Sequence, residues 1–219
     1  MKRLIAAVAL LSAAPAFAAP YVIDFEKTWD YSNSGVVSFY AGGQAADGTT
    51  GPDRGATFSN VFGVSNEAPF TYYQNAPSMV GTAYVFLSNS GDRALMNVGS
   101  GVTNTLSFSY SSPFEILGAV SAYSGENGTG TLLGTINLAA NDAGGFATET
   151  GNYGSWTLAT FNYQGVARSF DFSALAGNAG IDDIRYDTTI PVPAALPMMV
   201  LGLGALGAVA RRRRTSAAA

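Results

Sequence analysis

The residue types that most often carry out enzyme chemistry are scarce in this chain. It contains no His and no Cys, which excludes Ser-His-Asp and Cys-His catalysis, disulfides and nearly every transition-metal site. Carboxylate chemistry and oxygen-liganded cations remain. The paired carboxylic acids of a glycosidase could be Glu115 with Glu126 or Glu149, but nothing in their spacing selects them. We therefore assign no catalytic residue and expect no enzyme, with glycan hydrolysis as the weakest alternative.

Aromatic side chains with polar neighbours form a second group of candidates. Trp29 and Tyr31 follow the first expected strand, and Tyr72 and Tyr73 lie in a turn-flanked cluster. Flat rings beside polar groups can stack on sugar rings, so these four residues are the candidates for binding a polysaccharide. The same rings could instead pack in the core or across strands. Trp156 lies in a cleanly alternating run and is expected in the core.

Short alternating segments must position these side chains. Between Tyr21 and Asp187, runs rich in β-branched and aromatic residues are separated by Gly, Asn, Asp and Ser, and no stretch sustains a helical period. The expected strands cover residues 22–25, 36–40, 83–87, 105–110, 116–120, 131–136, 156–161 and 169–172. Polar, Gly-rich loops are expected at 44–54, 123–130 and 140–153. This spacing predicts an all-β protein whose body is a jelly-roll-like two-sheet sandwich.

The body of the chain is strongly acidic. Residues 19–193 carry five basic side chains against fifteen acidic ones, a net charge of −10, because the other basic residues lie in the terminal segments. Such a body has no basic patch to neutralise phosphates, which argues against nucleic acid as a partner. Its length of about 170 residues suits one domain with a substantial core.

The N-terminus has the three parts of a secretory signal peptide. Basic residues at positions 2 and 3 precede an apolar run over 4–14, and Ala16 and Ala18 are small residues at the positions that signal peptidase reads. Cleavage is expected between Ala18 and Ala19, which makes 1–18 the signal peptide. The run is too short for a membrane anchor, because as a helix it would reach only about 17 Å against a hydrocarbon core of about 30 Å.

A second apolar segment lies near the C-terminus and ends in a basic cluster. Residues 194–210 are apolar and are followed by Arg211, Arg212, Arg213 and Arg214. As a helix the segment would rise about 25 Å, the short limit for a transmembrane helix. The arginines predict a cytoplasmic C-terminus, with 215–219 as a short tail and the acidic body on the far side of the membrane.

Two prolines precede this segment and force an extended backbone, which suits recognition by a protease. The motif consists of Ile190, Pro191, Val192, Pro193 and Ala194. Together with the apolar helix and the arginines, it resembles the C-terminal sorting signal of VPLPA-CTERM proteins, relatives of the PEP-CTERM proteins that exosortases recognise. Pro191, Pro193 and Ala194 match the pattern, whereas Ile190 and Val192 are conservative departures from it.

This resemblance, over residues 190–214, implies a Gram-negative host and recognition by an exosortase-like protease in the membrane. It also implies removal of the tail and delivery from an inner-membrane intermediate to the cell surface or extracellular matrix. An ordinary single-pass tail anchor is the alternative.

A further resemblance concerns the two ends of the body, which runs from 19 to 189. The body opens on the sequence Val-Ile-Asp-Phe-Glu at 22–26 and closes on Ile-Asp-Asp-Ile at 181–184. Similar ends occur in jelly-roll bodies of sorted surface proteins and in carbohydrate-binding-module-like sandwiches, where first and last strands tend to be neighbours. The resemblance implies a structural calcium ion held by Glu26 and Asp183, with Asp24 or Asp182 as further ligands. Alternatively, these acids face solvent or pair with Arg185.

These observations favour a non-enzymatic surface or extracellular-matrix protein that is exported and then sorted by its tail. The expected partners are the membrane, signal peptidase and the exosortase-like protease. The alternative function, from a different class, is a carbohydrate-binding module that holds polysaccharide at the cell surface.

Overall fold

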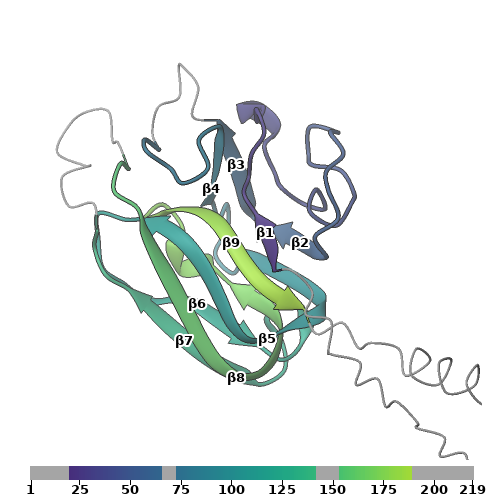
Figure 1. Cartoon of the computed structure of the whole chain (residues 1–219), viewed down its shortest axis with the longest axis vertical. Coiled ribbons are helices and arrows are strands. Elements are labelled where there is room, and N and C mark those ends of the chain that lie inside the picture. The colour runs from purple at the N-terminus through teal and green to yellow at the C-terminus, as the bar shows by residue number, and fades with distance from the viewer. Residues whose placement is uncertain (1–19, 66–72, 142–152, 189–219) are drawn as a thin grey trace, which may run out of the picture.

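The computed structural model describes residues 20–65, 73–141 and 153–188 and consists almost entirely of β-strands joined by turns (Figure 1). The predicted signal peptide, the sorting motif and the arginine cluster lie outside the described residues. Within the described ranges, no helix has the length and apolar character needed to cross a membrane. The strands are β1 (Tyr21–Ile23), β2 (Ala56–Ser59), β3 (Val61–Ser65), β4 (Gly81–Val85), β5 (Leu95–Ser111), β6 (Ile116–Tyr123), β7 (Leu132–Leu138), β8 (Thr157–Asp171) and β9 (Gly180–Thr188).

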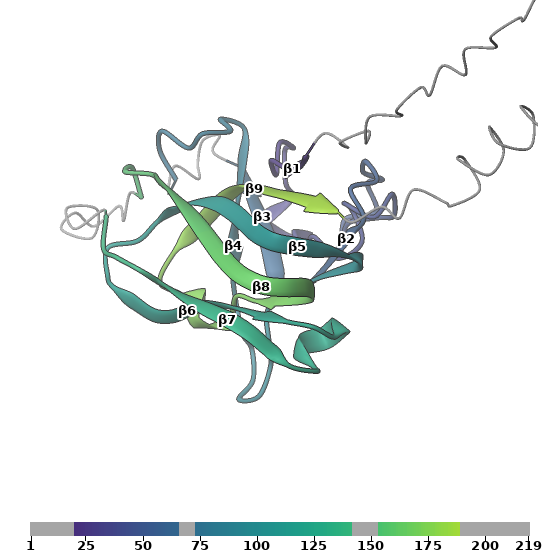
Figure 2. The same ribbon diagram turned by 60° about the horizontal axis from the view of Figure 1, so that its bottom comes forward.

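The strands form an antiparallel, sandwich-like sheet in the order β3-β4-β9-β5-β8-β6-β7, with β1 paired to β9 and β2 paired to β5. The long strands β5 and β8 pair along most of their length, but their register shifts between Asn97 and Val102. Such a shift bends and twists a strand pair. Figure 2 shows the result: β6 and β7 lie in a layer beneath β9 and the adjoining part of β5. The all-β prediction is confirmed.

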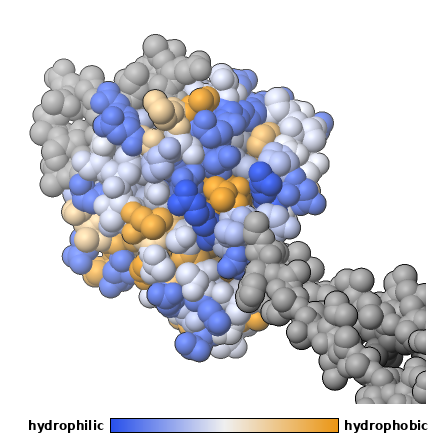
Figure 3. Space-filling view, viewed as in Figure 1, coloured by the Kyte–Doolittle hydropathy of each residue, from blue (hydrophilic) through white to orange (hydrophobic). Residues whose placement is uncertain are grey.

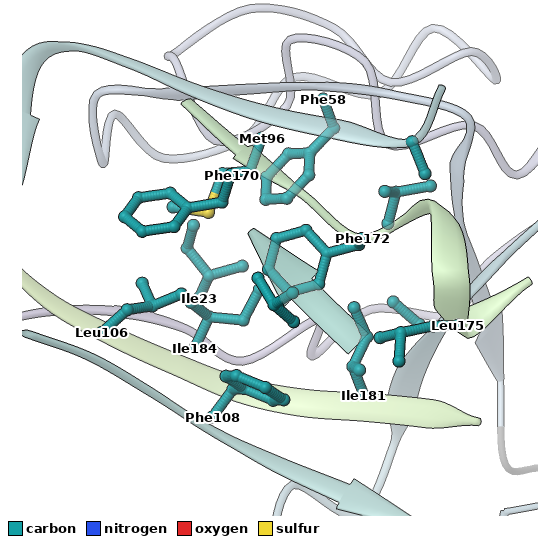
Figure 4. Close-up of a cluster of buried hydrophobic side chains, with 14 of the residues drawn as sticks. Ile23, Phe58, Met96, Leu106, Phe108, Phe170, Phe172, Leu175, Ile181 and Ile184 are labelled. Atoms are coloured by element: carbon teal, nitrogen blue, oxygen red, sulfur yellow. The ribbon is translucent and has the colours of Figure 1, made fainter. Parts of the chain in front are cut away.

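The core lies between these layers and follows from the alternation along the strands. In β8, Ala159, Phe161 and Tyr163 are buried, whereas Thr160 and Asn162 between them are exposed. The rings of Phe58, Phe108, Phe170 and Phe172 meet aliphatic side chains from β1 and β9, all of them fully or almost fully buried (Figure 4). The outside is mostly hydrophilic on the face shown in Figure 3, with apolar residues in small separate groups.

Two strand predictions differ from the structure. Residues 36–40 were expected to form a strand but fold into consecutive turns. The N–H of Phe39 donates to the carbonyl of Val36, and Val37 has a φ of 48°, so the backbone turns while Phe39 and Tyr40 still reach the core. The two strands expected at 156–161 and 169–172 belong to a single strand, β8. Only Trp156 and Phe172, at the outer ends of the two ranges, lie outside it.

The first and last strands are neighbours, as the resemblance implied. Tyr21 of β1 lies opposite Tyr186 of β9, and their rings are 5.7 Å apart. The described chain therefore begins and ends at adjacent positions. At its other end β9 pairs with β4, where Tyr84 lies opposite Gly180.

Candidate functional site

An open groove of about 520 Å³ lies on the side of the molecule formed by β3, β4 and the 3-10 turn η1 (Tyr31–Asn33). Five aromatic residues contribute to its lining, four of which are partly or largely exposed. These residues are Tyr31, Phe58, Phe62, Tyr84 and Phe86. Its size falls within the range of about 300–1,000 Å³ that is usual for small-molecule sites.

Strand pairing places three of these rings in a row. Phe62 of β3 lies directly opposite Tyr84 of β4, so both side chains point to the same face of the sheet. Their ring centroids are 5.7 Å apart and the planes are inclined by 29°, a stacked arrangement. Phe86, two residues beyond Tyr84, packs edge-on against Phe62 at 6.4 Å and is 55% exposed. Burial raises the pKa of the Tyr84 hydroxyl, which therefore stays neutral at physiological pH.

Tyr31 forms another wall of the groove and is held by a short capped turn. The carboxylate of Asp30 accepts hydrogen bonds from the N–H of Ser32 at 3.1 Å and from its hydroxyl at 2.8 Å. The side-chain amide of Asn33 donates to the carbonyl of Ala46, which fixes η1 against the neighbouring loop. Tyr31, the first residue of this turn, remains 59% exposed.

The segment after η1 runs along the free edge of β3 and completes the groove. The N–H of Val36 donates to the carbonyl of Val61 at 3.0 Å, and the N–H of Gly63 donates to the carbonyl of Ser34 at 2.8 Å. Gly35 lies close to the ring of Phe62, within about 4 Å of where a β-carbon would stand. The edge of the sheet is thereby covered, and the Phe62 ring faces the groove.

The polar lining of the groove consists of hydroxyl, amide and backbone groups. Ser32, Asn33, Ser59 and Asn60 contribute to it, and no Asp, Glu, Lys or Arg does so among the described lining residues. The amide of Asn60 is fixed by donating to the carbonyl of Arg93 at 2.9 Å. Flat rings beside neutral hydrogen-bonding groups can hold a ligand that has one apolar face and several hydroxyls.

Of the aromatic residues predicted to bind sugar, Tyr31 lies in the groove and Trp29 does not. Trp29 is only 4% exposed, and its indole N–H donates to the carbonyl of Phe25 at 2.9 Å. Its ring lies against Gly63, where an added β-carbon would stand 2.1 Å from the nearest indole carbon. The prediction that Trp29 is an exposed platform is therefore corrected: its ring belongs to the core, because Gly63 leaves room for it.

Tyr73 is also buried, so the prediction that it is an exposed platform for sugar is corrected as well. Its ring lies over Gly180 and packs against Tyr153 at 5.0 Å and Trp156 at 6.1 Å. Burial raises the pKa of its hydroxyl far above the usual range. Trp156, expected in the core, is only partly buried and donates its indole N–H to the carbonyl of Gln74. Tyr72 lies outside the described residues.

Sequence reasoning missed Phe62, Tyr84 and Phe86 as groove residues. Tyr84 and Phe86 lie two residues apart in an expected strand, and that spacing places both on one face. Phe62 belongs to β3, which was not predicted, so its position opposite Tyr84 could not be inferred. The spacing of Tyr84 and Phe86 was the feature of the sequence that could have indicated an aromatic site.

The predicted calcium ligands lie around one short segment, residues 78–81. One carboxylate oxygen of Glu26 accepts hydrogen bonds from the N–H groups of Val80 at 2.7 Å and Gly81 at 3.1 Å. Asp183 accepts a hydrogen bond from the hydroxyl of Ser78 at 2.8 Å and forms an ion pair with Arg185 at 2.6 Å. The alternative pairing with Arg185 is thus present in the structure.

Asp182 is the most buried carboxylate of this group, with no exposed surface. It accepts hydrogen bonds from the N–H groups of Ser78 at 2.9 Å and Asp183 at 2.8 Å. Burial, together with the nearby charges of Asp183 and Glu26, raises the pKa of Asp182 to about 8. Within the described ranges, no three Asp, Glu, His or Cys side chains are grouped so as to hold a metal ion. The calcium site stays a prediction.

The carboxylates considered for glycan hydrolysis do not form a pair. Glu115 and Glu126 are both exposed, and the eight-residue strand β6 lies between them in the chain. A strand of that length separates its two ends by about 26 Å, whereas paired glycosidase carboxylates lie about 5–9.5 Å apart. Glu149 lies outside the described residues.

No protein-family model and no curated protein sequence matches the chain. Among solved structures, the K1 cleaved adhesin domain of Lys-gingipain from Porphyromonas gingivalis matches with 12% identity over 78% of this chain and 99% of that domain, at a TM-score of 0.41. CBM29-2, a family 29 carbohydrate-binding module crystallised as a mutant, matches with 7% identity, coverages of 80% and 99%, and a TM-score of 0.38.

A carbohydrate-binding module from Cellvibrio mixtus lichenase 5A, in complex with cellotriose, matches with 15% identity over 61% of this chain and 90% of the module. Its TM-score is 0.36. Similarities at TM-scores below 0.5 establish neither a shared fold nor a shared ligand, and any function has to be argued from the site itself.

Proposed function

We propose that the body is a non-catalytic module that binds carbohydrate in the groove between η1 and β3. The observation that carries this proposal is the row of rings formed by Tyr84, Phe62 and Phe86, with Tyr31 exposed near them. A sugar ring has an apolar C–H face that stacks on an aromatic ring, and its hydroxyls pair with neutral polar groups such as Ser59.

The groove offers binding groups but not the parts of a hydrolase. None of its described lining residues carries a carboxylate, and glycosidic bond cleavage usually needs two of them on opposite sides of the bond. The site therefore supports holding a glycan rather than cleaving it.

We further propose that this module is exported and then sorted by its C-terminal tail. The groove lies well away from the point where the tail begins. Tyr84 is opposite Gly180 at the start of β9, and Thr188 lies eight residues further along the strand, or about 26 Å. A tail held at a surface would therefore leave the groove free to bind polymer.

Binding is tested by affinity electrophoresis and calorimetry against a panel of soluble glycans, with the wild type and two matched variants. Phe86→Ala removes an exposed ring of the groove, whereas Leu117→Ala removes an exposed side chain from β6 that does not line it. We expect Phe86→Ala to weaken binding about tenfold or more, equivalent to about 1.4 kcal/mol. Leu117→Ala should bind as the wild type does. Equal binding by both variants, or no retention on any glycan, would contradict the proposal.

Export and sorting are tested by mass spectrometry of the protein from intact cells and culture medium. A mature chain that begins at Ala19 and ends near Pro193 is expected. An intact chain ending at Ala219 in the inner membrane would reduce the tail to a simple anchor.

A further inference from the structure

The charges around the groove indicate what kind of glycan it can hold. We infer that the groove selects uncharged sugars and excludes uronic acids and sulfated sugars. This inference rests on the proposed carbohydrate binding and specifies its ligand class. It follows from three features of the molecule: the neutral lining, the internal pairing of the nearby basic residues, and the acidic body.

No basic side chain lines the groove in the described part of the chain, although Lys27 and Arg93 contact residues that are in the lining or next to it. Lys27, two residues before Trp29, forms an ion pair with Asp47 and lies over the indole ring at 4.5 Å. Arg93, whose carbonyl accepts the amide of Asn60, directs its guanidinium to Asp171 at 2.6 Å. Both cations are thus paired with acids of the same chain, and an anionic ligand would have to compete with those acids.

The remaining basic residues of the body do not supply a cation either. Arg185 pairs with Asp183, Arg168 lies on β8, and the carbonyl of Arg54 accepts the hydroxyl of Tyr186 beside the chain termini. None of these residues contributes to the lining of the groove. An anionic sugar would have to give up its hydration without gaining a charged partner, and this costs free energy.

The polar lining also favours ligands that donate hydrogen bonds. The amide nitrogen of Asn33 donates to the carbonyl of Ala46, and that of Asn60 to the carbonyl of Arg93. A side-chain amide fixed through its nitrogen offers its carbonyl oxygen as an acceptor on its other side. Sugar hydroxyls can donate to such oxygens. Carboxylates and sulfates carry only acceptors and would be repelled, as they also are by a body with a net charge of −10.

The sharpest test compares each neutral glycan with its own C6-oxidised counterpart, in which a carboxylate replaces the primary hydroxyl on the same polymer backbone. We expect the full-length protein to bind at least one neutral glucan or mannan. Oxidation of the glucan or mannan should weaken binding about tenfold or more at low salt, and added salt should reduce the difference.

A positive charge placed in the groove should weaken the selectivity against anionic sugars. Ser32 is exposed in η1 and lines the groove, whereas Thr160 is exposed on β8 and does not. Ser32→Lys should recover binding of the oxidised polymer, and Thr160→Lys should not. Circular dichroism and the melting temperature establish that both variants fold.

The possible outcomes separate the two proposals. Equal or tighter binding of the oxidised polymer by the wild type would overturn the selectivity while leaving carbohydrate binding in place. Retention of neither polymer would overturn carbohydrate binding itself, and the inferred selectivity with it. Equal effects of the two lysine variants would show that overall charge, and not the groove, determines the preference.

Discussion

The open groove and the closed aromatic cluster behind it are made of the same kinds of residue but differ in their access to solvent. Trp29 and Tyr31 are two residues apart in the chain, yet Trp29 is 4% exposed and Tyr31 is 59% exposed. In the closed cluster, Trp29 packs against Phe39, whose ring meets Tyr40 at 5.0 Å. In the groove, Phe62, Tyr84 and Phe86 form a row along one side of the sheet.

Strand β3 separates the two regions. The side chain of Phe62 points to the groove. The next residue, Gly63, faces the core, where the absence of a side chain leaves room for the indole of Trp29. A side chain at position 63 would collide with that indole, so the closed cluster depends on a missing side chain. The groove depends on the alternation of side chains along β3 and β4. This difference predicts that changes in the cluster alter stability and changes in the groove alter binding.

The largest effect is expected for Trp29→Ala. Removing a buried indole loses apolar contacts and leaves a cavity, at a cost of about 3–5 kcal/mol in the free energy of unfolding. Denaturant unfolding of the wild type and the variant measures this loss. A loss below about 1 kcal/mol would show that Trp29 is not a core residue. If the variant does not fold, the milder Trp29→Phe, which keeps an aromatic ring but loses the hydrogen bond to the carbonyl of Phe25, should still destabilise the protein.

The buried carboxylate of Asp182 gives the next largest effect, which depends on pH. Its pKa of about 8 in the folded state lies above the ordinary value of 3.8 for an Asp carboxyl, so the folded protein binds this proton more tightly than the unfolded chain does. The free energy of unfolding should therefore fall as pH rises from about 4 to about 8. Glu26 and Asp183 are the nearby charges that oppose ionisation.

Asp182→Asn should remove this dependence and raise the melting temperature at pH 8 relative to the wild type, by about 4 °C or more. Melting curves at pH 5, 6.5 and 8 measure it, and carbohydrate binding should remain unchanged because Asp182 lies outside the groove. Identical pH profiles for the two proteins would contradict a raised pKa.

Calcium offers a smaller effect on the same region. If Glu26 and Asp183 hold a calcium ion, a chelator should lower the melting temperature at neutral pH and added Ca²⁺ should restore it. The Asp183→Asn variant should respond less than the wild type. A melting temperature that is the same with chelator and with Ca²⁺ would remove the calcium prediction.

The smallest effect on stability is expected for Phe86→Ala, in the groove. An exposed ring contributes little to the core, and its loss should change the free energy of unfolding by about 0.5 kcal/mol or less. The same variant is expected to bind carbohydrate about tenfold or more weakly than the wild type. A loss of stability as large as that of Trp29→Ala would abolish the distinction between the two regions.

The sequence predicted the strand content of the body well, because alternation within single segments is a local property. The strands β2 and β3 and the turns at 36–40 were missed. Val36, Phe39 and Tyr40 reach the core through turns that contain a left-handed Val37, and a run of apolar residues does not reveal such a backbone. Of the aromatic residues predicted to bind sugar, only Tyr31 lines the groove among the described residues. The contact between Gly63 of β3 and the ring of Trp29 depends on tertiary packing, so neither segment of the sequence reveals it alone.

The position of β9 determines how the molecule would carry mechanical load. Its C-terminal end leads to the tail and its N-terminal end lies beside Tyr84. If the groove holds a polymer and the tail is held at a surface, as proposed above, a pull between them runs lengthwise along the strand. Along its length β9 is paired to β5 on one side and to β4 and then β1 on the other. Such a pull loads these hydrogen bonds in shear, so that many must break together rather than one after another. In the proposed arrangement, β9 links the groove to the tail and resists being drawn out through this paired length.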